Sequence, residues 1–296
     1  MKSNVDDEKL SSNEMLETYD TKWYDNQAKE SYISAKETLL YIDRLVPSLN
    51  YNVKNIIDIG CGVGTWLKAW QQTYENIDIC GIDGNDVEAE HFFIPYKYYQ
   101  KMDLTIDSNE LVNQIEKHCN NANIAINTAG GGGGKPFSIA QSLEVAEHLY
   151  SEYANNFIQL LTSLSDIILF SAAIPNQGGT HHVNEKPPMY WAEIFHKHNY
   201  VCFDILRKEI WDNEQIAWWY RQNTFFYVHK DRVRIFTELG YKPTQKPMYL
   251  VIPDMYESKS NQCKYQANEI EKLQNKLNKT FLRSLNRISK RLRGKL

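Results

Sequence analysis

The sequence has few cysteines, and its five are scattered without a Cys-x-x-Cys pair. An odd, unpatterned set argues against a disulfide framework or a cysteine-based zinc site and indicates a reducing compartment. No apolar run approaches the roughly eighteen residues that a membrane-spanning helix needs. The polar, acidic start of the chain also lacks the apolar segment of a secretory signal. These absences predict a cytoplasmic protein.

Basic charge is scarce over most of the chain. The net charge of −4 consists of −12 over residues 1–263 and +8 over residues 264–296, where ten Lys and Arg stand against two Glu. Nucleic acid requires a basic groove, so the acidic body disfavours a nucleic-acid partner. With 42% hydrophobic residues, the chain of 296 residues is long enough for one large α/β domain with additions.

A glycine-rich turn after an apolar segment is the most informative stretch. Asp58 precedes glycines at 60, 62 and 64, and a helix is predicted to begin near Thr65. Glycines let the backbone approach a ligand, and the unpaired N–H groups of a helix start point at the same space. The spacing differs from Gly-x-Gly-x-x-Gly of dinucleotide-binding folds, and a carboxylate here would repel pyrophosphate. It favours a ligand with an ammonium group and no phosphate, such as S-adenosylmethionine (SAM).

This Asp-x-Gly-x-Gly-x-Gly pattern resembles motif I of the class I SAM-dependent methyltransferases, and the alternative is an ordinary βα turn in another α/β protein. The resemblance implies a Rossmann-like α/β fold, with a seven-stranded, mostly parallel sheet, an antiparallel last strand and helices on both faces. Apolar segments predict strands at 55–59, 77–82, 96–99, 137–143, 166–173, 201–206 and 225–228. Helices are expected at 34–45, 66–73, 108–118 and 190–198. The five glycines at 130–134 predict an insertion before the fourth strand.

The resemblance also implies a cofactor pocket. Asp83 ends the second predicted strand, where a carboxylate can accept hydrogen bonds from both ribose hydroxyls. Asp103 is expected near the adenine amino group, with an N-cap or Asx turn as the alternative. The helix at 34–45 either covers this pocket, as in the family, or only packs on the sheet. The residues implied for SAM are Asp58, Gly60, Cys61, Gly62, Gly64, Trp66, Asp83, Gly84, Asp103, Leu104 and Ser142.

Acids and histidines form a second cluster after the fourth and fifth predicted strands. Glu144, Glu147 and His148 stand at helical spacing, which predicts all three on one face of a turn. His181 and His182 follow the neighbouring strand, and loops at the carboxyl ends of parallel strands form the ligand crevice. This mixture of carboxylates and imidazoles suits Mg²⁺, Mn²⁺ or Fe²⁺. The alternative is that Glu147 and His148 only cap and pack a helix.

Glu-Val-x-Glu-His after the fourth strand resembles two methyltransferase families. One comprises the ubiquinone-biosynthesis O-methyltransferases. The other comprises the small-RNA 3′-terminal 2′-O-methyltransferases, in which these residues and a later histidine bind a metal that holds vicinal hydroxyls. The resemblance implies a metal at Glu144, Glu147, His148 and His182. A metal lowers the pKa of a bound hydroxyl. The catalytic candidates, which include proton acceptors, are His181, His182 and Glu185.

Residues 170–185, with Tyr190 and Trp191 after them, resemble a bacterial methyltransferase subfamily of surface-polysaccharide genes. The resemblance covers residues 23–228 and departs at Ser138 and the glycine run. It implies O-methylation of a sugar hydroxyl, on a nucleotide-activated sugar such as a heptose or another glycan acceptor for capsule polysaccharide. Trp219 and Arg221 would face this acceptor, or the aromatic residues belong to the core. Alternatives are RNA 2′-O-methylation, a phosphate- or phosphoramidate-linked capsule precursor, and SAM binding without turnover.

Three parts of the chain are expected: a disordered N-terminus at 1–20, the methyltransferase domain at 21–256 and a basic helical tail at 257–296. Three structures are considered for the tail: a coiled coil that joins two copies, a helix on an anionic membrane, or a helix packed on the domain. The membrane alternative would place the protein at the inner face of the membrane. Apolar residues recur in the tail at helical spacing, at Ile270, Leu273, Leu277, Phe281, Leu285, Ile288 and Leu292.

Overall fold

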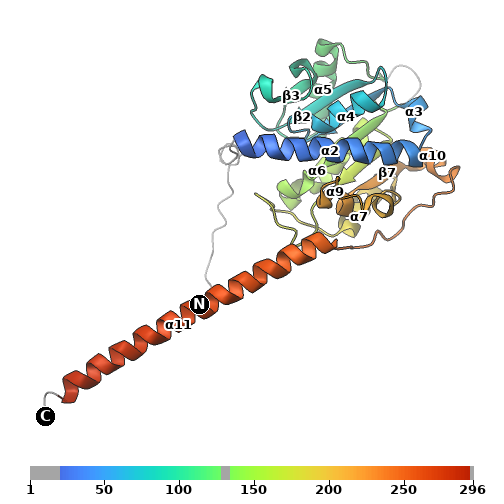
Figure 1. Ribbon diagram of the computed structural model, residues 1–296. Helices are drawn as coiled ribbons and strands as arrows, with labels where there is room; N and C mark the ends of the chain where they lie inside the picture. The colour runs from blue at the N-terminus through green and yellow to red at the C-terminus, as the bar shows by residue number, and fades with distance from the viewer. Residues whose placement is uncertain (1–20, 128–133, 294–296) are drawn as a thin grey trace. The chain divides into compact units, whose positions relative to one another are not determined.

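The computed structural model describes residues 21–127 and 134–293 (Figure 1). The expected disordered N-terminus and most of the glycine run lie outside these ranges. The chain divides into two compact units, Met1–Leu250 and Val251–Leu296, whereas the sequence analysis placed the tail from residue 257. The second unit contains one long helix, α11 (Pro253–Arg293).

The first unit is built on a seven-stranded sheet with the order β3-β2-β1-β4-β5-β7-β6. The first five strands pair in parallel, and β7 pairs antiparallel with both β5 and β6. This arrangement confirms the predicted class I methyltransferase fold. The strands are β1 (Asn55–Ile59), β2 (Asp78–Asp83), β3 (Tyr99–Lys101), β4 (Ile139–Leu143), β5 (Ile167–Ser171), β6 (Tyr200–Phe203) and β7 (Phe225–His229).

Helices cover both faces of the sheet. Along β1 the side chains alternate between two cores, with Ile56 in one and Ile57 in the other. The core that holds Ile56 contains residues of α2 (Thr21–Leu45) and α4 (Thr65–Thr73), and the opposite core contains residues of α5 (Ser108–Ala122), α6 (Ala154–Leu164) and α7 (Pro188–Lys197). Shorter helices are α3 (Leu49–Asn52), α8 (Arg207–Ile210), α9 (Trp218–Asn223) and α10 (Arg234–Thr237).

The third strand and one helix differ from the prediction. Residues 96–98 form a 3₁₀ turn rather than a strand, because Pro95 fixes the entry and its carbonyl accepts the N–H of Tyr98 at 3.0 Å. The strand begins only at Tyr99. The helix α6 was not predicted, although its apolar side chains have helical spacing: Phe157, Ile158, Leu160, Leu161 and Leu164 are all fully buried.

All five cysteines are free. Four of them are buried, and Cys263 on α11 is exposed. Among the described residues, no helix combines the length and the apolar character needed to cross a membrane.

Candidate active site

The glycine turn between β1 and α4 is packed against two neighbouring loops. Gly60 and Gly64 have φ angles of +85° and +77°, which glycine adopts without strain. A Cβ atom on Gly60 would lie 2.3 Å from Cγ2 of Val145, and one on Gly64 would lie 2.7 Å from Cγ1 of Ile94. The Gly62 N–H donates to Oδ2 of Asp83 at 2.7 Å. The turn therefore requires glycine for its conformation and for close packing.

A cavity of about 680 Å³ opens at the carboxyl ends of the strands, beside this turn. All the residues predicted to bind SAM line it except Gly64 and Ser142. Gly64 instead begins α4 in a left-handed conformation. The Ser142 side chain is buried inside the sheet, because β4 continues to Leu143 before the chain reaches the cavity.

Acidic side chains line one wall of the cavity. Burial raises the pKa of Asp58 to about 7, opposed in part by the Gln141 side chain. Burial likewise raises the pKa of Asp83, while backbone N–H groups that donate to it lower it. The Asp103 carboxylate accepts the backbone N–H and the hydroxyl of Thr105 at 2.9 and 2.7 Å. Asp103 thus forms the Asx turn of the alternative prediction while it also lines the cavity.

The helix α2 forms a second wall of the cavity, so it both packs on the sheet and covers the pocket. Its Leu39 and Ile42 side chains are fully buried in the core. At least two turns nearer its start, Ser31 lines the cavity, and its hydroxyl lies 2.8 Å from Oγ1 of Thr65 and 3.3 Å from the Tyr220 hydroxyl. The segments before β1 and before β7 therefore meet over the pocket.

Glu144 does not share a helical face with Glu147, contrary to the prediction from spacing. Its φ is +56°, and the 3₁₀ turn begins only at Ala146. Its carboxylate accepts hydrogen bonds from Nε2 of Gln177 at 2.8 Å and from Nδ2 of Asn223 at 3.1 and 3.3 Å. Two amides from distant segments therefore hold Glu144 at the cavity wall. Burial raises its pKa to about 7.

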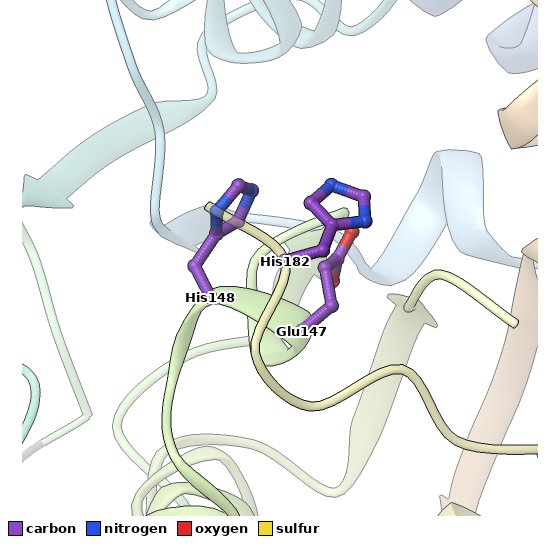
Figure 2. A group of neighbouring side chains, drawn as sticks. All are labelled: Glu147, His148 and His182. Carbon is purple, nitrogen blue, oxygen red and sulfur yellow. The ribbon is translucent and has the colours of Figure 1, made fainter. Parts of the chain in front are cut away.

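Three of the four predicted metal ligands are gathered in one group, Glu147, His148 and His182 (Figure 2), and His148 also lines the cavity. One ligand atom from each lies within 4.8 Å of the others, and Glu144 is not part of the group. The Glu147 carbonyl accepts the N–H groups of Val183 and Asn184 at 2.9 and 3.0 Å, which ties the loop after β5 to the loop after β4.

Glu147 is fully buried, and no donor lies in good hydrogen-bond geometry to either of its carboxylate oxygens, although the backbone of Glu147 and Ala173 lies close enough to lower its pKa in part. Burial and the nearby Glu144 raise its pKa well above the ordinary value. For His148, burial and the neighbouring His182 lower the pKa to about 4. A buried carboxylate without a well-placed donor is costly, and a bound cation would offset that cost. The pair of imidazoles beside it completes a donor set that fits a divalent metal such as Mn²⁺ or Fe²⁺.

Glu185 positions the loop around His182 and is not among the residues that line the cavity, and its role as a proton acceptor stays a prediction. One of its oxygens accepts the Gly178 N–H at 2.6 Å and lies 3.0 Å from Nδ1 of His182, and the other accepts the Asn176 N–H at 2.7 Å. This contact directs the other ring nitrogen of His182 away from Glu185. His181, whose φ is +58°, lines the cavity, whereas His182 does not.

The aromatic insert contributes to the cavity only in part. Trp219 and Tyr220 line it, and Tyr220 packs edge-on against Trp66 with ring centroids 5.1 Å apart. Arg221 is 5% exposed, and its Nη1 donates to the Trp211 carbonyl at 2.8 Å. Arg221 therefore stabilises the fold of the insert and does not face an acceptor, contrary to the prediction.

The amides of Gln177 and Asn223 were not singled out from the sequence. Both lie within residues 23–228, which the resemblance covers. In the sequence they are only two polar residues far apart, and nothing there indicates that they share a partner. Their common target became visible only when both were found on Glu144, with Nδ2 of Asn223 also donating to Oε1 of Gln177 at 2.9 Å.

No family model and no curated protein matches this chain. Among solved structures, the chain is similar to magnesium protoporphyrin IX methyltransferase from Synechocystis with bound SAH, at 16% identity and a TM-score of 0.42, over 66% of this chain and 83% of that one. For an O-methyltransferase family protein from Burkholderia thailandensis the identity is 10% and the TM-score 0.44, over 71% and 60% of the two chains. For the methyltransferase domain of bacterial CtHen1-C the values are 15% and 0.40, over 67% and 98%.

Proposed function

We propose that the chain is a SAM-dependent O-methyltransferase that acts on a sugar hydroxyl with the help of a divalent metal. The acceptor we infer is a nucleotide-activated sugar or related glycan precursor of a capsule. The observation that carries the proposal is the fully buried Glu147 carboxylate, which has no donor in good hydrogen-bond geometry and lies with His148 and His182 beside an acid-lined cavity.

The cavity fits a cationic methyl donor. Asp58 and Asp83 lie beside the glycine turn, and opposite charge stabilises a buried carboxylate in its ionised form. When bound, SAM supplies a methyl group on a positively charged sulfur. The part of this chain is to hold the donor in one orientation, since methyl transfer depends largely on in-line placement of the acceptor oxygen. Ser31 of α2 and Trp66 form part of the wall around that space.

Glu147, His148 and His182 would hold the metal, which supplies Lewis acidity toward an acceptor hydroxyl. Glu185 keeps the His182 ring in place through the contact with Nδ1. Glu144, fixed by its two amides, is placed to accept a hydrogen bond from the acceptor hydroxyl at the cavity wall. His181 would accept the hydroxyl proton, because it lines the cavity and histidine is the side chain that most often acts as a general base.

Aromatic side chains favour a sugar as the acceptor. Tyr150, Tyr153, Trp219 and Tyr220 line the cavity, and aromatic faces pack on the C–H surfaces of sugars. The acidic character of residues 1–263 disfavours an RNA backbone. Since Arg221 is bonded within the fold, a phosphate of the acceptor would need another partner.

A screen of nucleotide sugars, capsule precursors and short RNA with labelled SAM tests the acceptor. We expect label in a nucleotide sugar. The labelled methyl group should be stable to alkali, because it is held in an ether. Label in RNA alone would replace the proposal by RNA 2′-O-methylation. Label that is released together with the phosphate group of a phosphate- or phosphoramidate-linked precursor, and is not retained on the sugar, would place the methyl group on phosphate.

Metal binding is tested separately, by titration of Mn²⁺ into the metal-free protein and into a Glu147→Gln variant. We expect one site in the parent protein, and an affinity at least about 100-fold lower in the variant, since loss of an outer partner alone costs about 10–100-fold. Glu193→Gln, on the exposed side of α7, is the matched control. Full activity of the metal-free protein would refute the metal assignment and leave the SAM assignment standing.

A further inference from the structure

The helix α11 carries an apolar face that no other element of its unit covers. It runs without interruption over Pro253–Arg293 (Figure 1). Six side chains, which we name the apolar row, are 45–69% exposed: Ile270, Leu273, Leu277, Phe281, Leu285 and Ile288. Their spacings of 3, 4, 4, 4 and 3 span 18 residues, which equals five turns of about 3.6 residues. The row therefore stays on one line of a straight helix.

Cations occupy another face of the same helix. With about 100° of rotation per residue, they centre roughly 140° away from the apolar row. From residue 272 to the end of the sequence there are nine Lys and Arg and no Asp or Glu. We name the exposed cations of this stretch the basic face: Lys272, Lys276, Lys279, Arg283 and Arg287.

The charge pattern disfavours a second copy of this chain as the occupant of the apolar row. Coiled-coil pairs carry opposite charges along the edges of the seam. Residues 272–288 have cations only, so two copies would repel in either orientation. Three consecutive spacings of four also depart from the alternation of three and four in a heptad.

An anionic lipid surface complements both faces at once. Apolar side chains of an interfacial helix enter the boundary of the acyl chains, and Lys and Arg stems reach from the polar face to the headgroups. An RNA partner would use the basic face but would leave the apolar row in water. We propose that α11 is an interfacial helix that binds the protein to an anionic phospholipid surface. The proposal does not depend on the methyl acceptor.

The test is co-sedimentation of the full chain with phosphatidylcholine vesicles, with and without about one-third phosphatidylglycerol. We expect binding only to the anionic vesicles. Lys276→Gln with Arg283→Gln should lower the partition constant about 25-fold, at roughly fivefold for each cation. Lys117→Gln with Lys208→Gln removes two exposed cations from the other unit and should leave binding unchanged. Leu277→Gln with Phe281→Gln should abolish binding.

Three results would overturn the proposal. The first is absence of binding to anionic vesicles. The second is a dimer in light scattering that Leu277→Gln with Phe281→Gln converts to a monomer. The third is binding of a single-stranded RNA oligonucleotide that the same apolar variant retains while vesicle binding is absent. Thermal unfolding monitored by circular dichroism verifies that each variant keeps its fold.

Discussion

Replacement of Asp58 by Asn should stabilise the ligand-free protein. Asp58 is 3% exposed, and burial raises its pKa from 3.8 to about 7. Between these two values the unfolded chain is ionised while the folded chain keeps its proton. The free energy of unfolding therefore falls as pH rises through this window and stays low above it. A difference of about 3 units at 1.36 kcal/mol each amounts to about 4 kcal/mol.

Asparagine does not ionise, so the gain should grow with pH. We expect Asp58→Asn to raise the free energy of unfolding about 2–3 kcal/mol more at pH 8 than at pH 5. The same change should weaken SAM binding about 10- to 100-fold, since hydrogen bonds to a charged partner contribute about 1.5–3 kcal/mol. In the parent protein, SAM affinity should fall as pH decreases through about 7, because Asp58 then becomes neutral.

Urea denaturation at both pH values measures the first effect, and isothermal titration calorimetry of SAM measures the second. Asp78→Asn is the control, because Asp78 stands at the opposite end of β2 and is partly exposed. The reasoning is wrong if Asp58→Asn leaves stability equally changed at pH 5 and pH 8. Unchanged SAM affinity in this variant would remove Asp58 from the cofactor site.

Three further substitutions test residues that hold the metal site or stabilise the fold. Glu185→Gln should lower Mn²⁺ affinity about 10- to 100-fold in a titration, because Glu185 orients the ring of His182. Gly179→Ala would place a Cβ atom 2.2 Å from Nε2 of His182, so displacement of the ring should reduce turnover about 100-fold. Arg207→Met should cost about 3–5 kcal/mol in urea denaturation, since Arg207 is 1% exposed and the Asp204 carboxylate would lose its partner.

Each of these substitutions has a control that distinguishes a local effect on the site from a general loss of structure. Glu185→Gln and Gly179→Ala should leave SAM affinity within about twofold, since neither residue lines the cavity. Equal loss of SAM and Mn²⁺ binding would indicate a general loss of structure instead. Lys208→Met, on the exposed side of the same short helix, should change stability by less than about 0.5 kcal/mol.

Local sequence patterns were sufficient to predict the elements whose structure depends on residues close together in the chain. The glycine turn, the apolar strands and the amphipathic helices depend on φ preferences and on periodicity, and the sequence contains both. The rule that loops at the carboxyl ends of parallel strands converge also placed Glu147, His148 and His182 together. The third strand was misplaced because Tyr96 and Tyr99 pack with Phe92 in an aromatic cluster, which has no strand periodicity.

The sequence alone thus determined the fold, the glycine turn and the residue types of the second cluster. Tertiary structure decided the orientation of Glu144, since its partner Asn223 is 79 residues away and meets it only through the order of the strands. It also decided that Arg221 supports the insert and that Glu185 holds His182. Hydrogen-bond partners depend on distances between segments, and sequence spacing contains no information on those distances.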